Sequence, residues 1–154
     1  MTTGNPAHKE EKVNLSRNEI QMIGYNFDEM GRVFSWQGRI FRLIYPEKEQ
    51  AVKALFSCGL MTELEKAGLF PKTTIAPYTL EDADLILEHE KIDPVVLHSN
   101  WSFDMLKDAG LCLLKVNKIA QKYGYQTIDG HGLNILFKSG SPLFIDLGSF
   151  IQNT

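Results

Sequence analysis

Residues 128–148 read IDGHGLNILFKSGSPLFIDLG, and this stretch predicts a β-hairpin that is entered through a loop with two glycines. Its two apolar runs, 135–137 and 143–145, have the length and composition of short strands. The polar segment between them has Gly140 near its centre, where a tight turn needs conformational freedom. Antiparallel pairing about this glycine would bring the residues that flank the two runs to one open end.

Polar side chains converge at that open end. Asn134 and Asp146 lie equally far from Gly140, six residues to each side, so antiparallel pairing places them side by side. Asp129 arrives at the same end from the preceding loop. Mg²⁺ prefers such oxygen ligands, one or two carboxylates together with substrate phosphates. We therefore predict a magnesium–phosphate site in which Asn134 and Asp146 bind the metal.

Two residues of the loop complete this predicted site. Asp129 is placed to accept a proton from an attacking hydroxyl, and His131 would orient or hydrogen-bond within the loop. Considered alone, an aspartate at a position such as 129 more often caps a turn than acts in a site. It is the combination with His131, Asn134 and Asp146 that favours a phosphate or metal site.

The rest of the chain predicts helices and strands in mixed order, which is the pattern of an α+β fold. In chain order these are a hairpin of strands 32–36 and 39–44 around Gln37-Gly38, a helix over 49–67 that is broken near Gly59 and ends at Gly68, strands at 73–76 and 83–89, and a helix over 102–123 that ends at Gly124. The long helix is apolar around much of its circumference, so we expect it to be central in the fold.

Composition limits the classes of function. The 154 residues suffice for one domain, and we expect a disordered leader over 1–12 followed by a single domain over 13–154. The net charge is −3, with 16 Lys and Arg against 19 Asp and Glu, and there is no basic stripe, so a nucleic-acid partner is not expected.

No apolar run has the length of a membrane span, and the first twenty residues do not have the apolar core of a signal peptide. Cys58 and Cys112 fit no metal spacing and are expected to be buried thiols of a cytoplasmic protein.

The loop and hairpin resemble the protein-kinase-like superfamily, and their residue pattern is most similar to that of its aminoglycoside-phosphotransferase branch. The shared pattern is an Asp at 129, a His two residues later, an Asn five residues later and a distal Asp-Leu-Gly at 146–148. The resemblance implies Asp129 as catalytic base and Asn134 and Asp146 as metal ligands. It also implies a minimal kinase-like fold: an N-lobe hairpin and helix, a strand ending near Glu88 in the hinge position, a long central helix, the catalytic-loop hairpin, and a truncated C-lobe.

The same resemblance implies ATP and Mg²⁺ as cofactors. Arg42 stands on the strand that would carry the phosphate-binding lysine, and an arginine can bind phosphates through two hydrogen bonds. Glu63 or Glu65 on the following helix could pair with Arg42, and the nucleotide-binding set is then Arg42, Glu63 and Glu88. The alternative for Arg42 is a solvent-facing strand residue or a structural ion pair.

A second resemblance runs from about residue 30 to 150. Segments such as 87–92, 100–109 and 142–150 are similar to the N-terminal region of large bacterial class I SAM-dependent methyltransferases, in which a kinase-like segment precedes the methyltransferase domain. This implies a methyltransferase domain as partner, in cis or in trans, and a chain that is either truncated or a stand-alone module. Residues 145–149 begin like a SAM-binding loop, but Phe150 stands where its second glycine is needed, so SAM would bind only through the partner domain.

Three functions remain open at this point. The first is an accessory, ATP- and Mg²⁺-binding module of a methyltransferase-type protein, which does not methylate by itself. The second is an ATP- and Mg²⁺-dependent phosphotransferase that acts on a small molecule with Asp129 as base. The third is a pseudokinase that serves only protein contacts. An accessory module predicts an exposed apolar patch where its partner domain docks.

Overall fold

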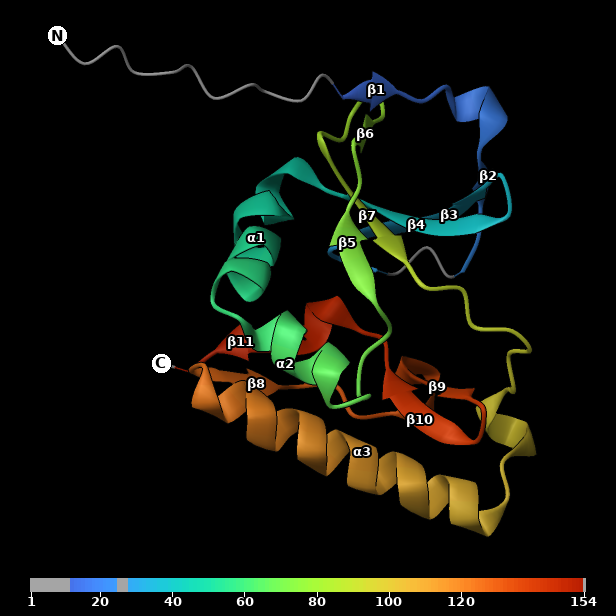
Figure 1. The fold of residues 1–154 in the computed structure, drawn as a ribbon, viewed down its shortest axis with the longest axis vertical. Helices are drawn as coiled ribbons and strands as arrows, with labels where there is room; N and C mark the ends of the chain where they lie inside the picture. The colour runs from blue at the N-terminus through green and yellow to red at the C-terminus, as the bar shows by residue number, and fades with distance from the viewer. Residues whose placement is uncertain (1–11, 25–27, 154) are drawn as a thin grey trace, which may run out of the picture.

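A five-stranded antiparallel sheet forms one half of the molecule in the computed structural model, which describes residues 12–24 and 28–153 (Figure 1). The strand order is β2-β3-β4-β7-β5. The bounds are β2 Gln21–Met22, β3 Gly31–Trp36, β4 Arg39–Ile44, β7 Leu85–His89 and β5 Thr73–Ile75. Helices and the C-terminal strands fill the other half, so the predicted α+β class is confirmed. The expected leader over 1–12 lies almost entirely outside the described residues.

The hairpin β3–β4 forms as predicted. Its two-residue turn places both Gln37 and Gly38 at positive φ, 50° and 74°, the turn geometry that matches the twist of the flanking strands. Phe34 lies opposite Phe41, and the two rings stack with centroids 5.4 Å apart. At the far end, Gly31 lies so close to β4 that a Cβ would come within 1.8 Å of the Leu43 carbonyl oxygen, so only glycine fits there.

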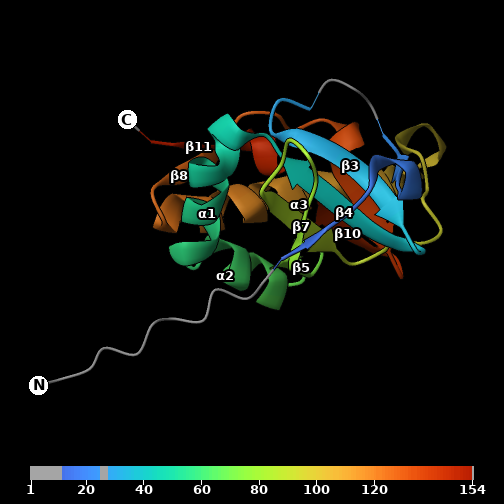
Figure 2. The same cartoon turned by 90° about the horizontal axis from the view of Figure 1, so that it is seen from above.

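The predicted helix over 49–67 is two helices, α1 Glu49–Ser57 and α2 Leu60–Lys66. Gly59 separates them with a φ of 94°, which confirms the predicted break, and Gly68 follows α2 with a φ of 66°. In the view from above, α1 and α2 stand to one side of strands β3 and β4 (Figure 2). Their buried residues join the main hydrophobic core: Val52, Leu55, Leu60, Met61 and Leu64.

The long helix α3 spans Phe103–Lys122, and the Ser102 hydroxyl accepts a hydrogen bond from the Met105 amide at its start. It packs on β8 Tyr125–Thr127 and on β10 Ser141–Phe144, and β8 pairs antiparallel with β11 Phe150–Gln152. The expected central position is wrong, because α3 lies along one edge of the molecule (Figure 1). Only one face has neighbours among the described residues, and that face buries Ala109, Cys112, Val116 and Ala120.

The C-terminal hairpin is confirmed, with β9 Ile135–Lys138 paired to β10. Its register differs by one residue from the prediction. Ser139 and Gly140 both have positive φ, 50° and 81°, so the turn is centred between them rather than on Gly140. Consequently Asn134 pairs with Ile145, whose amide donates to the Asn134 carbonyl at 2.9 Å, instead of with Asp146.

A second, smaller core covers the opposite face of the sheet. It contains Leu15, Phe34, Phe41, Leu43 and Ile86, and it is closed by β1 Val13–Asn14, which pairs parallel with β6 Tyr78–Thr79. Within the described residues no helix is long and apolar enough to cross a membrane. Of the two cysteines Cys112 is buried as expected, whereas the prediction for Cys58 is wrong: it is exposed just after α1.

Candidate functional site

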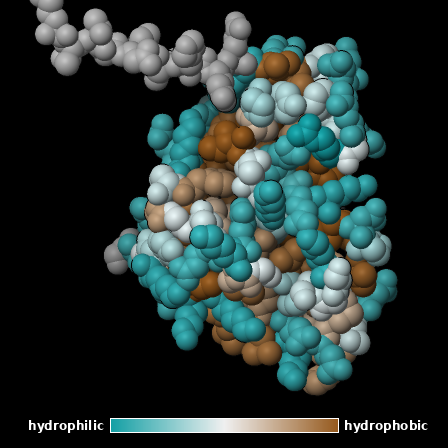
Figure 3. All heavy atoms as spheres, viewed as in Figure 1, coloured by the Kyte–Doolittle hydropathy of each residue, from teal (hydrophilic) through white to brown (hydrophobic). Residues whose placement is uncertain are grey.

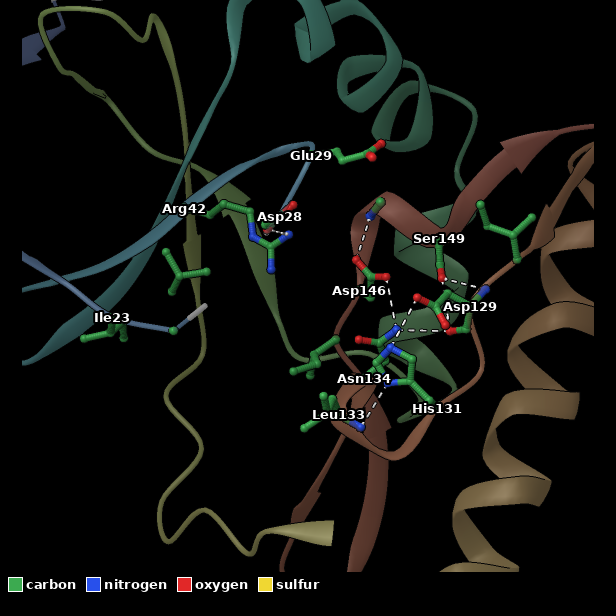
Figure 4. Close-up of a pocket in the computed structure, with 15 residues that line it drawn as sticks. Ile23, Asp28, Glu29, Arg42, Asp129, His131, Leu133, Asn134, Asp146 and Ser149 are labelled. Carbon is green, nitrogen blue, oxygen red and sulfur yellow. Dashed lines mark hydrogen bonds and ion pairs between the residues drawn. The ribbon is translucent and has the colours of Figure 1, made fainter. Parts of the chain in front are cut away.

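A pocket of about 620 Å³ lies between the sheet and the loop that precedes β9 (Figure 4). The four residues predicted from the loop and hairpin all line it: Asp129, His131, Asn134 and Asp146. Arg42 and Asp28 lie on the opposite side of the pocket, at the sheet (Figure 4). The sequence therefore placed five of the seven candidate residues in one pocket, while Glu63 and Glu88 line neither this pocket nor the slot beside it.

Asn134 joins the two aspartates. Its Nδ2 donates to the backbone oxygen of Asp129 at 3.1 Å and to Oδ2 of Asp146 at 3.2 Å. The side chains of Asn134 and Asp146 meet despite the shifted register because β9 and β10 end at Ile135 and Phe144, beyond which the chain leaves the regular ladder. The predicted convergence at the open end of the hairpin is thus confirmed.

The carboxyl group of Asp146 is in an unusual electrostatic state. Burial raises its pKa, and the Gly148 amide, which donates to Oδ1 at 2.9 Å, opposes that shift. Arg42 lowers the pKa and Asp28 raises it, both through space. A partly buried carboxylate of this kind gains stabilisation from a nearby cation.

The side-chain oxygens of Asn134 and Asp146 suit a magnesium ion that also binds a phosphate. Nδ2 of Asn134 makes both hydrogen bonds, and no described residue donates to its Oδ1, which therefore remains available as a ligand oxygen beside Asp146. In the described part of the chain, no group of three or more His, Cys, Asp or Glu side chains could hold a metal by itself. One carboxylate and one amide oxygen are the partial set that Mg²⁺ uses when phosphates and water supply the rest.

His131 orients the Asp129 carboxylate. Nδ1 of His131 accepts a hydrogen bond from the Leu133 amide at 3.2 Å, so the hydrogen of the neutral ring lies on Nε2. Nε2 is 3.2 Å from Oδ2 of Asp129. Both side chains are about half exposed, so the carboxylate is oriented and also open to the pocket.

Ser149 is a residue of this site that the sequence did not single out. Its hydroxyl donates to the Asp129 carbonyl and accepts from the Asp129 amide, both at 3.2 Å. Ser149 is 1% exposed, so this exchange fixes the backbone of the loop from the buried side. Its position three residues after Asp146 carried no sequence signal, because the contact depends on the return of β11 beside the loop.

Arg42 pairs with Asp28, and the predicted pairing with Glu63 or Glu65 is wrong. Nη1 of Arg42 lies 2.9 Å from Oδ2 of Asp28, and both side chains are largely buried. Glu63 instead binds Lys122 and the Tyr123 hydroxyl at the end of α3, and Glu65 accepts from the Thr73 amide. The helix α2 faces α3 rather than Arg42, which is why its glutamates cannot reach the strand.

Glu88 also has another partner. Its carboxylate binds the Arg39 guanidinium through two hydrogen bonds, of 2.8 and 2.5 Å, across the β4–β7 pair. This ion pair lies on the side of the sheet away from Arg42, since Glu88 and Leu87 point to opposite faces and Leu87 is the residue opposite Arg42.

The Arg42–Asp28 pair is expected to matter for stability. Asp28→Ala should lower the free energy of unfolding by about 2–3 kcal/mol, because it leaves a guanidinium that is 8% exposed without its counter-charge. Urea unfolding followed by circular dichroism measures the loss. The double variant Arg42→Met, Asp28→Ala should recover most of it, and a double variant as unstable as Asp28→Ala would show that the loss has another cause.

A second, smaller pocket of about 340 Å³, which we call the slot, adjoins the first and shares Ile23, Val33, Arg42 and Ile145 with it. Its walls are apolar on two sides: Ile23, Val33 and Ile40 come from the sheet, and Leu136 and Ile145 come from the C-terminal hairpin. The segment 89–93 that follows β7 forms one edge. Two apolar layers with a polar backbone edge suit a flat ring.

His89 is one of the residues that line this slot. The Thr73 hydroxyl donates its hydrogen to the Pro71 carbonyl, so it accepts from Nδ1 of His89 at 2.9 Å, and Nε2 carries the lone pair of the neutral ring. Burial, with a smaller effect of the Arg42 charge, lowers the pKa of His89 to about 3. Three buried side-chain nitrogens have no hydrogen-bond partner among the described residues: His89 Nε2, Arg42 Nε and Arg42 Nη1, whose contact with Asp28 is an ion pair.

This histidine predicts a loss of stability in acid. Its pKa is about 3 in the folded chain against 6.5 unfolded, so the unfolded chain binds the extra proton and stability falls as the pH drops below 6.5. Between about pH 7 and pH 5 the contribution of His89 should be about 2 kcal/mol. Urea unfolding of the wild type and of His89→Asn, whose amide can still donate to Thr73, measures it. Equal pH dependence in the two proteins would exclude His89 as the cause.

No protein-family model matches the chain, and no curated protein matches it significantly.

Proposed function

We propose that the chain is a kinase-like module that binds ATP with Mg²⁺ and serves as an accessory unit of a SAM-dependent methyltransferase-type protein. The observation that carries the nucleotide part is the continuity of an apolar slot with a pocket lined by Asp129, Asn134 and Asp146. The slot has a volume of about 340 Å³ and apolar walls from two layers, which suit an aromatic ring such as a purine, and the pocket has the oxygen ligands and the arginine for a magnesium-bound phosphate chain.

The individual residues have distinct places in this proposal. Ile23, Val33 and Ile145 would contact the two faces of the ring, and Asp146 with Asn134 would hold the metal. A bound Mg²⁺ would neutralise phosphate charge. Arg42 would reach the phosphates when its ion pair with Asp28 opens.

The kinase-like fold and the accessory role rest on further support. The order of a hairpin, two helices, strand β7, helix α3 and the loop before β9 is the order that the resemblance of the sequence implies. The similarity to methyltransferase-type proteins covers about residues 30–150, a range that includes Arg42 on the sheet side of the pocket and Asp129, Asn134 and Asp146 on its other side. SAM binding and methyl transfer are assigned to the partner domain.

Ligand-induced thermal stabilisation tests the nucleotide site. With ATP and Mg²⁺ at about 100 times the dissociation constant, the folded chain should gain about 2.7 kcal/mol, which raises Tm by roughly 5–10 °C. Asp146→Ala should lose this gain. The matched control is Asp108→Ala, which removes an exposed carboxylate on α3 and should keep it. If millimolar ATP with Mg²⁺ leaves the Tm of the wild-type chain unchanged, nucleotide binding is refuted.

Phosphoryl transfer is the second candidate function, and the exposure of Asp129 favours it. This carboxylate is oriented by His131 yet open to the pocket, as a base that receives the proton of an acceptor hydroxyl needs to be. Its small-molecule acceptor would enter where Asp129 and His131 border the pocket.

A further inference from the structure

Arg42 is the charged side chain that this fold buries most deeply. It is 8% exposed, and no other charged residue in the described part of the chain is buried to this degree. By contrast, hydrophilic residues cover much of the molecular face in Figure 3, where water can satisfy them. A guanidinium has five N–H donors and is costly to bury unless they are used, so the partners of Arg42 decide what it can do.

The donors of Arg42 are poorly used in this structure. Nη1 lies 2.9 Å from Oδ2 of Asp28, but this ion pair does not have the geometry of a hydrogen bond. Nη1 and Nε therefore both lack a hydrogen-bond partner among the described residues. A buried donor that stays unsatisfied costs free energy, so an arrangement that satisfies these donors is favoured.

His89 presents the complementary atom. Its Nδ1 donates to the Thr73 hydroxyl, which fixes the ring and leaves the lone pair of the neutral imidazole on Nε2. This Nε2 is buried and has no hydrogen-bond partner among the described residues. One unsatisfied acceptor and two unsatisfied donors thus belong to two side chains that line the same slot.

The sheet places these two side chains next to each other. His89 lies opposite Ile40 in the β4–β7 pair, and Ile40 is two residues from Arg42 on β4. His89 and Arg42 are therefore diagonal neighbours on one face of the sheet, within reach of a side chain as long as arginine. After burial, the charge of Arg42 is the second cause that lowers the pKa of His89, as expected for groups this near.

We propose that His89 is a positioning residue for Arg42. When a phosphate group draws the guanidinium away from Asp28, Nε–H of Arg42 donates to Nε2 of His89, and the two Nη groups turn to phosphate oxygens. The fixed imidazole then holds the arginine in the orientation in which it binds phosphate. This inference rests on the proposed function, because it takes a nucleotide phosphate as the group that Arg42 binds.

Two amide substitutions at His89 separate this role from a structural one. Asparagine places its amide near the position of Nδ1, so His89→Asn can still donate to Thr73 but offers Arg42 no acceptor. Glutamine reaches the position of Nε2, so His89→Gln keeps that acceptor and gives up the bond to Thr73. In calorimetric titration with ATP and Mg²⁺, His89→Asn should bind at least about 10-fold more weakly than the wild type, and His89→Gln within about 3-fold of it. A purely structural role predicts the reverse order, and that order would overturn the proposal.

Nitrogen NMR of His89 tests the contact without nucleotide. The Nε2 resonance of a neutral imidazole moves upfield when that nitrogen accepts a hydrogen bond. Asp28→Ala frees Arg42 in the nucleotide-free chain and should produce this upfield shift, and the additional change Arg42→Met should remove it. An unchanged resonance in Asp28→Ala would overturn the proposal, and so would a shift that persists without Arg42.

The same resonance distinguishes failure of this proposal from failure of the nucleotide site. In the wild type, ATP with Mg²⁺ should produce the upfield shift that Asp28→Ala shows. ATP binding without the shift would keep the nucleotide site and refute the role of His89. No ATP binding, together with the shift in Asp28→Ala, would refute the nucleotide site and support the contact between Arg42 and His89.

Discussion

Phe144→Ala is expected to lower the free energy of unfolding by about 3–5 kcal/mol, the range for loss of a fully buried aromatic side chain. Phe144 is 0% exposed, and its ring makes edge contacts with Phe70 and Phe150, at centroid distances of 6.4 and 5.7 Å. Its amide donates to the Leu69 carbonyl at 2.8 Å. This residue therefore connects the segment after α2 to the hairpin that carries Asp146, and urea unfolding should show the loss.

Phe103→Ala is the matched control, because it removes the same atoms from a side chain that is 81% exposed. Its effect should stay within about 0.5 kcal/mol. Similar losses in the two variants would contradict the assignment of Phe144 to the core. The comparison of the two variants thus distinguishes a phenylalanine of the core from one on the surface of α3.

Asp129→Asn is expected to reduce ATP turnover by at least about 100-fold if the chain transfers phosphoryl groups, because asparagine cannot accept the proton of the attacking hydroxyl. Since no acceptor is identified, hydrolysis of ATP, with water as the acceptor, is the reaction to measure. The thermal stabilisation by ATP and Mg²⁺ should persist in this variant, because Asn134 and Asp146 are unchanged. Asp104→Asn, an exposed carboxylate at the start of α3, is the control that should hydrolyse like the wild type.

The outcomes separate the three functions. Turnover in the wild type that disappears in Asp129→Asn supports phosphotransfer. Nucleotide binding without turnover in either protein supports the accessory module. If the chain shows neither binding nor turnover, protein contacts remain as its possible role. Turnover that is unchanged in Asp129→Asn would contradict the assignment of Asp129 as base.

Elements that depend on local sequence were predictable. The turn at Gln37-Gly38, the break at Gly59 and the start of α3 at Ser102 each follow from a short-range signal. The register of the β9–β10 hairpin was missed by one residue, because Ser139 adopts a positive φ beside Gly140, and a non-glycine residue rarely does so. The position of α3 was missed because hydropathy reports an apolar surface but not whether this chain covers it.

In the candidate site, too, the residues that are close in sequence were predictable and the contact between distant segments was not. Asp129, His131, Asn134 and Asp146 are close in sequence, and one hairpin brings them together. The partner of Arg42 is Asp28, from a loop on the other side of β3, and pairing on the basis of helix position selected Glu63 instead. Contacts that join distant segments depend on the packing of whole elements, which the sequence pattern does not specify.

The place of β4 in the middle of the sheet has a consequence for synthesis. The hairpin β3–β4 is complete at Ile44, but the neighbour on its other edge, β7, ends 45 residues later at His89. At about 5–20 residues per second the ribosome needs roughly 2–9 s to cover that distance. During this interval the strand RIFRLI presents an open edge rich in apolar side chains, which another nascent chain could pair with. Arg39 and Arg42 are the two charges that interrupt this segment, so replacing both would be expected to send more of the newly made protein into aggregates.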